Sequence, residues 1–125
     1  KKLIYALNQI KPPFNVNRPG LFAAAASVKD TKWLKRETKH TNRWAKIFYT
    51  HFKKLGIETN FSYANFLLIN FDKIKKNSKN IFLKLAKSGI IVRTMDVYKI
   101  KNSLRVTIGT SSENRKFIKK LCKII

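Results

Sequence analysis

The sequence predicts an α/β chain in which helices come first and a small mixed α+β domain follows. Two observations support this. Residues 31–55 carry apolar side chains at every third or fourth position, which is typical of a long amphipathic helix. After Gly56, short apolar or alternating runs of strand length are separated by helical patterns, and the predicted order is β, α, β, β, α.

The first 30 residues are expected to form two helices. Four apolar residues share one face of the first: Leu3, Ile4, Leu7 and Ile10. Pro12-Pro13 should end this helix, because proline blocks its continuation. Asn17 can cap a second helix that has Pro19 in its first turn and runs through alanines to Ala26, and its small side chains favour close packing.

The long helix of residues 31–55 follows, with Asp30 placed to cap its start and Gly56 placed to end it. Its apolar stripe is expected to face the core and consists of Trp33, Leu34, Trp44, Ala45, Phe48, Phe52 and Leu55. The Lys and Arg side chains of the helix are left on the outside.

Three strands and two helices are predicted beyond Gly56. The strands are residues 65–71, 90–93 and 104–108, and the last alternates apolar and polar side chains. A helix over residues 78–88, with Gly89 as its stop, should turn Ile81, Phe82, Leu85 and Ala86 inward. Thr110 and Glu113 form a capping box for a final helix whose apolar side is Phe117, Ile118, Leu121 and Ile125.

The net charge is +22, from 28 basic and 6 acidic residues, while 44% hydrophobic content excludes a disordered basic tail. Only six basic residues are Arg, and the 22 Lys are scattered along the chain. Two interpretations stay open. The lysines reflect the drift of an AT-rich coding sequence, or they form a surface for a polyanion.

Few residues suit catalysis or metal binding. His40 and His51 have no Cys or carboxylate at ligand spacing, so we expect surface or groove histidines and no metal site. Cys122 is expected to be a core thiol in a reducing cytoplasm, since a single Cys forms no internal disulfide. No apolar run approaches 18 residues, so no membrane span is expected, and the glycines form no phosphate loop.

Arg93 and Arg105 are each expected near a strand end, in a chain that otherwise uses Lys for positive charge. The planar guanidinium binds a carboxylate or phosphate through two parallel hydrogen bonds, which Lys cannot do. The residues alone leave two alternatives, a paired anion site or two ordinary surface arginines.

Four stretches, in this order, resemble the C-terminal part of histidinol-phosphate aminotransferases. They are IKPPFNVN (residues 10–17), SYANF (62–66), GIIVR (89–93) and LRVTIGT (104–110) followed by Glu113-Asn114. The resemblance implies the fold type I architecture of pyridoxal-phosphate enzymes. Residues 1–30 would then be the tail of the large cofactor-binding domain and a linker, and residues 31–125 the small domain, a short antiparallel sheet backed by helices.

The resemblance also implies roles for single residues. Arg105 matches the arginine that holds the distal anion of the substrate, and Arg93 matches the second phosphate-contacting arginine of this branch. Asn65, in the family's Asn-Phe pair, is interpreted as structural. Tyr98-Lys99-Ile100 stands where the family often has Tyr-Gly-Leu, so the tightness of this loop is in question.

In the family, the lysine, aspartate and aromatic residue that hold pyridoxal phosphate lie upstream of where this chain begins, and no Ser-x-x-Lys occurs here. No catalytic residue is therefore expected in this chain, which would be inactive alone. The resemblance implies that the intact enzyme is a cytoplasmic homodimer. It would convert L-histidinol phosphate and 2-oxoglutarate to imidazole acetol phosphate and L-glutamate in histidine biosynthesis. Neither a membrane nor a nucleic acid is expected as a partner. The alternative is a small basic nucleic-acid-binding or ribosome-associated domain.

Overall fold

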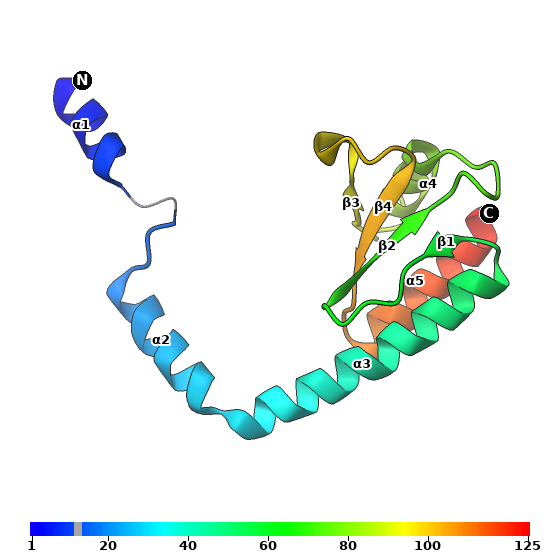
Figure 1. Ribbon diagram of the computed structural model, residues 1–125, viewed down its shortest axis with the longest axis horizontal. Coiled ribbons are helices and arrows are strands. Elements are labelled where there is room, and N and C mark those ends of the chain that lie inside the picture. The colour runs from blue at the N-terminus through cyan, green and yellow to red at the C-terminus, as the bar shows by residue number, and fades with distance from the viewer. Residues whose placement is uncertain (12–13) are drawn as a thin grey trace. The chain divides into compact units, whose positions relative to one another are not determined.

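The computed structural model describes residues 1–11 and 14–125, so Pro12-Pro13, expected to end the first helix, lies outside the described residues. The described chain divides into two compact units, Lys1–Arg36 and Glu37–Ile125. Figure 1 shows the elements of both units in chain order.

The first unit contains α1 (Lys2–Ile10) and α2 (Arg18–Lys29), as the sequence predicted. Asn17 caps α2, because its Oδ1 accepts a hydrogen bond of 2.7 Å from the Gly20 amide. No described residue of either helix is buried, so the expected close packing of α2 is wrong for this unit. Alanine side chains allow another element to pack closely against a helix, but the described part of the first unit contains no sheet against which α2 could pack.

The long helix α3 (Thr31–Lys54) begins at Asp30, whose Oδ1 accepts a hydrogen bond of 2.9 Å from the Trp33 amide. Gly56 ends it with φ at 70°, a conformation that glycine adopts without strain. Its buried residues all come from the second half: Trp44, Ala45, Phe48 and Phe52. Trp33 and Leu34, expected to face the core, are 51% and 57% exposed, since the hydrophobic core lies entirely within the second unit.

The second unit is built on a four-stranded antiparallel sheet in the order β1-β2-β4-β3. The strands are β1 (Glu58–Thr59), β2 (Phe66–Asn70), β3 (Arg93–Thr94) and β4 (Ser103–Thr107). The helices are α4 (Ser78–Ala86), the short 3-10 helix η1 (Asp96–Tyr98) and α5 (Ser111–Ile124). The antiparallel sheet with its helices confirms the predicted fold class.

Two strand predictions need correction. The sequence did not indicate β1, which has only two residues. The strand predicted at residues 90–93 pairs with β4 only from Arg93 onward. Ile90 and Val92 are apolar because they pack against the core and not because they lie in the sheet.

One face of the sheet carries the core. Leu67 and Ile69 of β2 and Leu104 and Val106 of β4 cluster with buried side chains of α3, α4 and α5. The three helices accordingly back one face of the sheet, as Figure 1 shows. Alternate residues of β2 and β4 point to the face opposite α3, α4 and α5, and this open face carries the arginines.

Candidate anion-binding site

β4 places Arg105 on the open face of the sheet. Its neighbours Leu104 and Val106 are buried in the core, so alternation along the strand turns the Arg105 side chain the other way. β4 pairs with β2 on one side and β3 on the other, and Arg105 is its middle residue, not one near its end as expected. Its backbone is therefore fixed by hydrogen-bonded strands on both sides.

Arg93, the first residue of β3, lies directly opposite Arg105 in the antiparallel register. Residues opposite each other in such a pair extend to the same face of the sheet, and like charges in this position are destabilising. An anion bound between the two guanidinium groups would relieve the repulsion. The structure thus brings together the two site residues that the sequence predicted, here called the arginine pair.

An aromatic ring lies beside each member of the arginine pair. The Arg105 guanidinium carbon is 4.9 Å from the centroid of the Phe66 ring, on the neighbouring strand β2. The Arg93 guanidinium carbon is 5.3 Å from the ring centroid of Tyr98, and its Nη2 donates a hydrogen bond of 2.8 Å to the Tyr98 hydroxyl. Aromatic rings attract cations in this way. Sequence reasoning missed both aromatic residues, because only the register and the turn after β3 show their proximity.

Arg105 also holds an unused hydrogen-bond donor. Its Nε is buried and has no hydrogen-bond partner among the described residues, although the residue as a whole is partly exposed. A buried donor without a partner costs about 1–3 kcal/mol and is rare in folded proteins. A carboxylate or phosphate oxygen would satisfy it, and would receive a second parallel bond from the same guanidinium.

The two histidines have separate contacts. The described residues contain no group of three His, Cys, Asp or Glu side chains that could hold an ion. His40 instead donates from Nε2 to the carbonyl oxygen of Gly109, at 2.9 Å. His51 Nε2 lies 3.2 Å from the sulfur of Cys122. Cys122 is exposed, so its prediction as a core thiol is wrong: the buried side of α5 is formed by Asn114, Phe117 and Leu121.

Residues 1–121 match the family model described as aminotransferase class I and II. The chain belongs to this family. A histidinol-phosphate aminotransferase of Pelagibacter ubique is 48% identical over 119 residues, which are 94% of this chain and 33% of that protein. One of Nitrobacter hamburgensis is 38% identical over 90% of this chain and 31% of its own length. The chain therefore spans about a third of the curated relatives it matches.

The solved structure of the histidinol-phosphate aminotransferase from Clostridium acetobutylicum has the same fold. It matches with a TM-score of 0.76 at 22% identity and covers 98% of this chain and 37% of that chain. None of the helices described here has the length and apolar character needed to cross a membrane.

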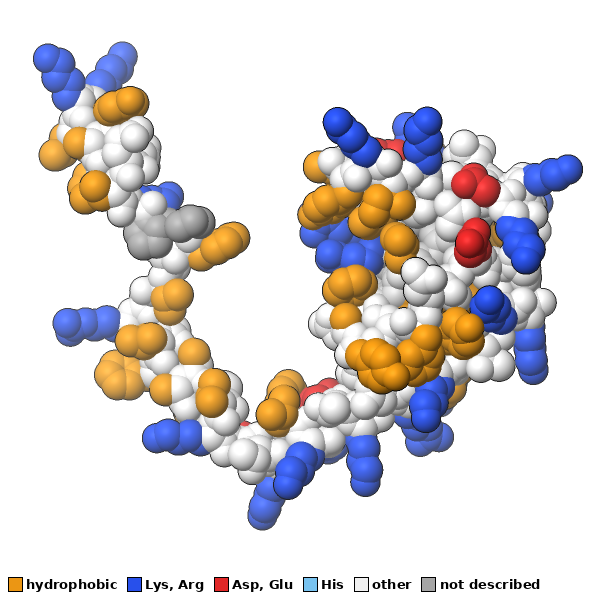
Figure 2. Space-filling model, viewed as in Figure 1, with side chains coloured by type: hydrophobic (Ala, Val, Ile, Leu, Met, Phe, Trp, Pro, Cys, Tyr) orange, Lys and Arg blue, Asp and Glu red, His pale blue; other side chains and the backbone are white. Residues whose placement is uncertain are grey.

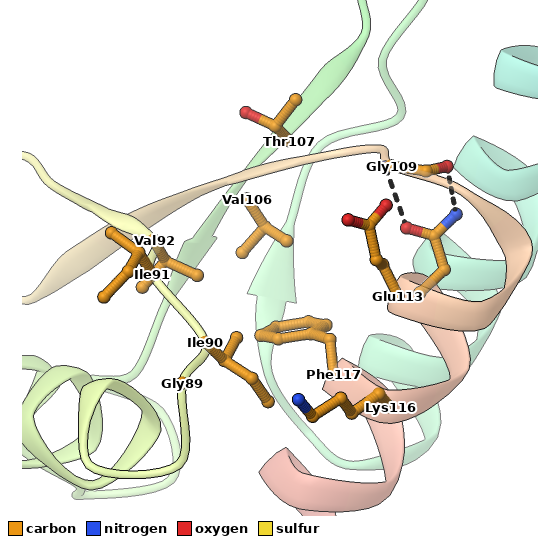
Figure 3. A pocket seen from close by; sticks show the side chains of 11 residues that line it. Gly89, Ile90, Ile91, Val92, Val106, Thr107, Gly109, Glu113, Lys116 and Phe117 are labelled. Atoms are coloured by element: carbon orange, nitrogen blue, oxygen red, sulfur yellow. Dashed lines mark hydrogen bonds between the residues drawn. The ribbon is translucent and has the colours of Figure 1, made fainter.

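The aminotransferase-like motif of Gly109, Thr110, Glu113 and Asn114 is a closed hydrogen-bond network at the start of α5. The Thr110 amide donates to Glu113 Oε2 at 2.8 Å and the Glu113 amide donates to Thr110 Oγ1 at 3.3 Å, which forms the predicted capping box; the Thr110 hydroxyl also donates to Oε2 at 2.7 Å. The Asn114 side chain accepts from the Gly109 amide and donates to its carbonyl, both at 2.9 Å, as Figure 3 shows. The network fixes the segment that connects β4 to α5.

The bonds from Thr110 also change the titration of Glu113. Hydrogen bonds from the Thr110 hydroxyl and then from its amide lower the pKa of the Glu113 carboxyl below its ordinary value of 4.5. The carboxyl lines a hollow of about 390 Å³ where residues 90–92 diverge from β4, between Ile91, Val106 and Phe117 (Figure 3).

On the face seen in Figure 2, the basic side chains of this aminotransferase family member are spread out. Figure 2 shows Lys and Arg side chains over both units on the visible face, without one continuous basic patch. No described lysine is buried, and no described carboxylate is buried. The spread of charge on this face is typical of compositional drift, since a polyanion surface concentrates its cations.

Proposed function

We propose that this chain is the C-terminal part of a pyridoxal-phosphate-dependent histidinol-phosphate aminotransferase and supplies the site for the substrate phosphate. The intact enzyme would transfer the amino group of L-histidinol phosphate to 2-oxoglutarate in histidine biosynthesis. The names of the relatives support this proposal. The observation that carries it is the arginine pair, with a buried unsatisfied Nε on Arg105 directly opposite Arg93.

The two arginines would divide the binding of the phosphate. Arg105, held in one of the two inner strands, would direct two parallel donors to two phosphate oxygens. Arg93, on the exposed edge, would approach from the neighbouring strand and add a second positive charge. Binding of the phosphate would orient the substrate, which lowers the entropy cost of reaching the transition state.

The described residues do not fit pyridoxal phosphate itself. The cofactor needs a lysine amine in a shielded position and commonly a carboxylate at its pyridine nitrogen. Every described lysine and carboxylate reaches the surface. When bound, the cofactor carries the amino group between the two substrates. We propose that its ligands belong to the remaining two thirds of the longer enzyme.

The domain assignment and the assembly follow from the same proposal. Residues 1–30 would be the end of the large cofactor domain with its linker, and residues 31–125 the small domain. The exposed apolar face of α1, which includes Leu3 and Leu7, suits such a role because it needs a covering surface. The intact enzyme would be a cytoplasmic homodimer. The comparisons give no support to the nucleic-acid-binding alternative, and a single function is proposed.

Substitution of Arg105 in the longer enzyme tests the proposal. Arg105→Lys keeps the charge but loses the two parallel donors. The kcat/KM for histidinol phosphate should therefore fall by an amount that corresponds to a loss of about 1.5–3 kcal/mol in transition-state stabilisation. Arg105→Ala should cost more, without changing the absorbance of the cofactor. Arg43→Lys, on the exposed side of α3, is the matched control. An unchanged kcat/KM in Arg105→Lys would show that β4 does not hold the substrate anion.

A further inference from the structure

Tyr98 contacts the arginine pair but has no role assigned by the sequence. It ends η1, five residues after Arg93, and its hydroxyl accepts the 2.8 Å hydrogen bond from Arg93 Nη2. We infer that Tyr98 is a positioning residue, which holds Arg93 beside Arg105 and so makes the site select a phosphate dianion over a single carboxylate. The inference rests on the proposed function, because it concerns the same anion site.

Arg93 needs such a support more than Arg105 does. Arg105 is partly buried, lies in one of the two inner strands and has the Phe66 ring beside it. Arg93 is exposed on a two-residue edge strand and faces a like charge directly opposite. Without a partner, its long side chain would gain entropy and lose repulsion by turning into solvent. The hydroxyl and ring of Tyr98 offset both effects.

The backbone fixes Tyr98 although 51% of its surface is exposed. Met95, 8% exposed, accepts hydrogen bonds on its carbonyl from the amides of Tyr98 at 3.0 Å and Ile100 at 3.4 Å. Lys99 then reverses the chain in the left-handed conformation, with φ at 57°, and its amide donates to Asp96 at 2.9 Å. This closed turn follows β3 directly, so the Tyr98 ring returns to the side chain of Arg93.

The consequence for selectivity follows from the charge and shape of the ligands. One guanidinium satisfies a carboxylate with two parallel hydrogen bonds, and Arg105 alone provides them. A phosphate dianion has a further oxygen and a further charge, which a second guanidinium can bind. Loss of the support from Tyr98 should therefore weaken phosphate binding and leave carboxylate binding unchanged.

The test uses the 125-residue chain with inorganic phosphate and acetate as probes. Each anion is titrated while the NMR signals of the arginine Nε–H groups are followed, in the wild type and in Tyr98→Phe, Arg93→Ala and the double variant. We expect Tyr98→Phe to weaken phosphate binding by about threefold to tenfold, the effect of one modest hydrogen bond, with acetate unchanged. The double variant should bind phosphate no more weakly than Arg93→Ala, because Tyr98 acts through Arg93.

Tyr63→Phe is the matched control, since Tyr63 is 87% exposed and lies outside the arginine pair. Phosphate affinity in Tyr98→Phe equal to the wild type, or losses that add in the double variant, would overturn the role of Tyr98 and leave the anion site standing. If phosphate shifts neither arginine signal in the wild type, the anion site itself is wrong and the inference fails with it. Dispersed amide signals in each variant verify that the fold is retained.

Discussion

His40 and Gly109 are joined across 69 residues of sequence by a hydrogen bond of 2.9 Å between the imidazole Nε2 and the backbone carbonyl. One turn further along α3, the indole Nε1 of Trp44 donates to the Ser111 hydroxyl at 3.0 Å. These two bonds attach α3 to the segment that connects β4 to α5. The strand that carries Arg105 therefore ends at a point held by the long helix.

We expect His40→Ala to lower the free energy of unfolding by about 1 kcal/mol, because it removes one hydrogen bond and leaves a partly buried carbonyl with one partner fewer. Urea unfolding followed by tryptophan fluorescence measures the loss. His51→Ala is the control, since its contact is with the exposed Cys122 sulfur and should be worth less. Equal losses in the two variants would contradict the importance of the Gly109 contact.

Gly109→Ala should destabilise the chain through the cap of α5. A Cβ at position 109 would lie 2.7 Å from Glu113 Oε2, so the carboxylate would have to leave its bonds to Thr110. Loss of a cap costs about 0.5–2 kcal/mol, and denaturant unfolding should show a loss of this size. In a Glu113→Ala background the same change should cost less, since the obstructing group is gone. Strictly additive losses would exclude this mechanism.

Glu113 should make stability depend on acid pH. Its pKa is lowered in the folded chain, so its contribution is fully present above about pH 4.5 and is lost as the pH falls through the folded pKa. We expect Glu113→Gln to flatten this part of the profile. Unfolding free energies measured from about pH 6 down to about pH 3 in both proteins test it. Parallel profiles would show that Glu113 does not titrate with folding.

Lys99→Gly should stabilise the turn after β3. Lys99 has φ at 57°, where a side chain crowds the backbone and glycine is free of that strain. Part of the gain is offset by the greater freedom of glycine in the unfolded chain, which leaves a net increase of about 0.5–1 kcal/mol. Lys87→Gly is the matched control. Lys87 has a right-handed helical backbone, with φ at −57°, so its replacement by glycine should lower the stability measured by thermal unfolding.

The 125-residue chain should not form a specific covalent adduct with pyridoxal phosphate. Its lysines all reach the surface, so none is set apart by burial as a Schiff-base lysine commonly is. After incubation and borohydride reduction, mass spectrometry should find label spread thinly over many lysines. One lysine labelled stoichiometrically would contradict the proposal that the cofactor site lies elsewhere in the longer enzyme.

The sequence predicted those parts of the fold that local chemistry determines. The caps at Asn17 and Asp30, the stop at Gly56 and the capping box of Thr110 and Glu113 each depend on residues within a few positions. Helix starts were correspondingly accurate, whereas α2 ends at Lys29 and not at Ala26, and α4 ends at Ala86 and not at residue 88. The pairing of strands depends on distant residues, so β1 was missed and residues 90–92 were assigned to a strand, although Ile90 and Val92 pack against the core without pairing in the sheet.

The site was predicted in part for the same reason. Arginine chemistry and the family resemblance indicated Arg93 and Arg105, but spacing alone could not show that they lie opposite each other. The aromatic neighbours Phe66 and Tyr98 and the unsatisfied Nε required the register of the sheet and the turn after β3. Burial of α3 was overestimated at Trp33, because an apolar stripe does not show how far its covering surface extends.

The unequal attachment of the two arginines has a consequence for how this family diverges. A change at Arg105 disturbs a strand that is paired on both sides. β3, in contrast, is an edge strand of only two residues and is followed by a turn. Insertions or substitutions there leave the ladder between β2 and β4 intact. If the arginine pair binds the substrate anion as proposed, relatives that accept different anionic substrates should differ mainly at positions 93 and 98 and retain arginine at 105.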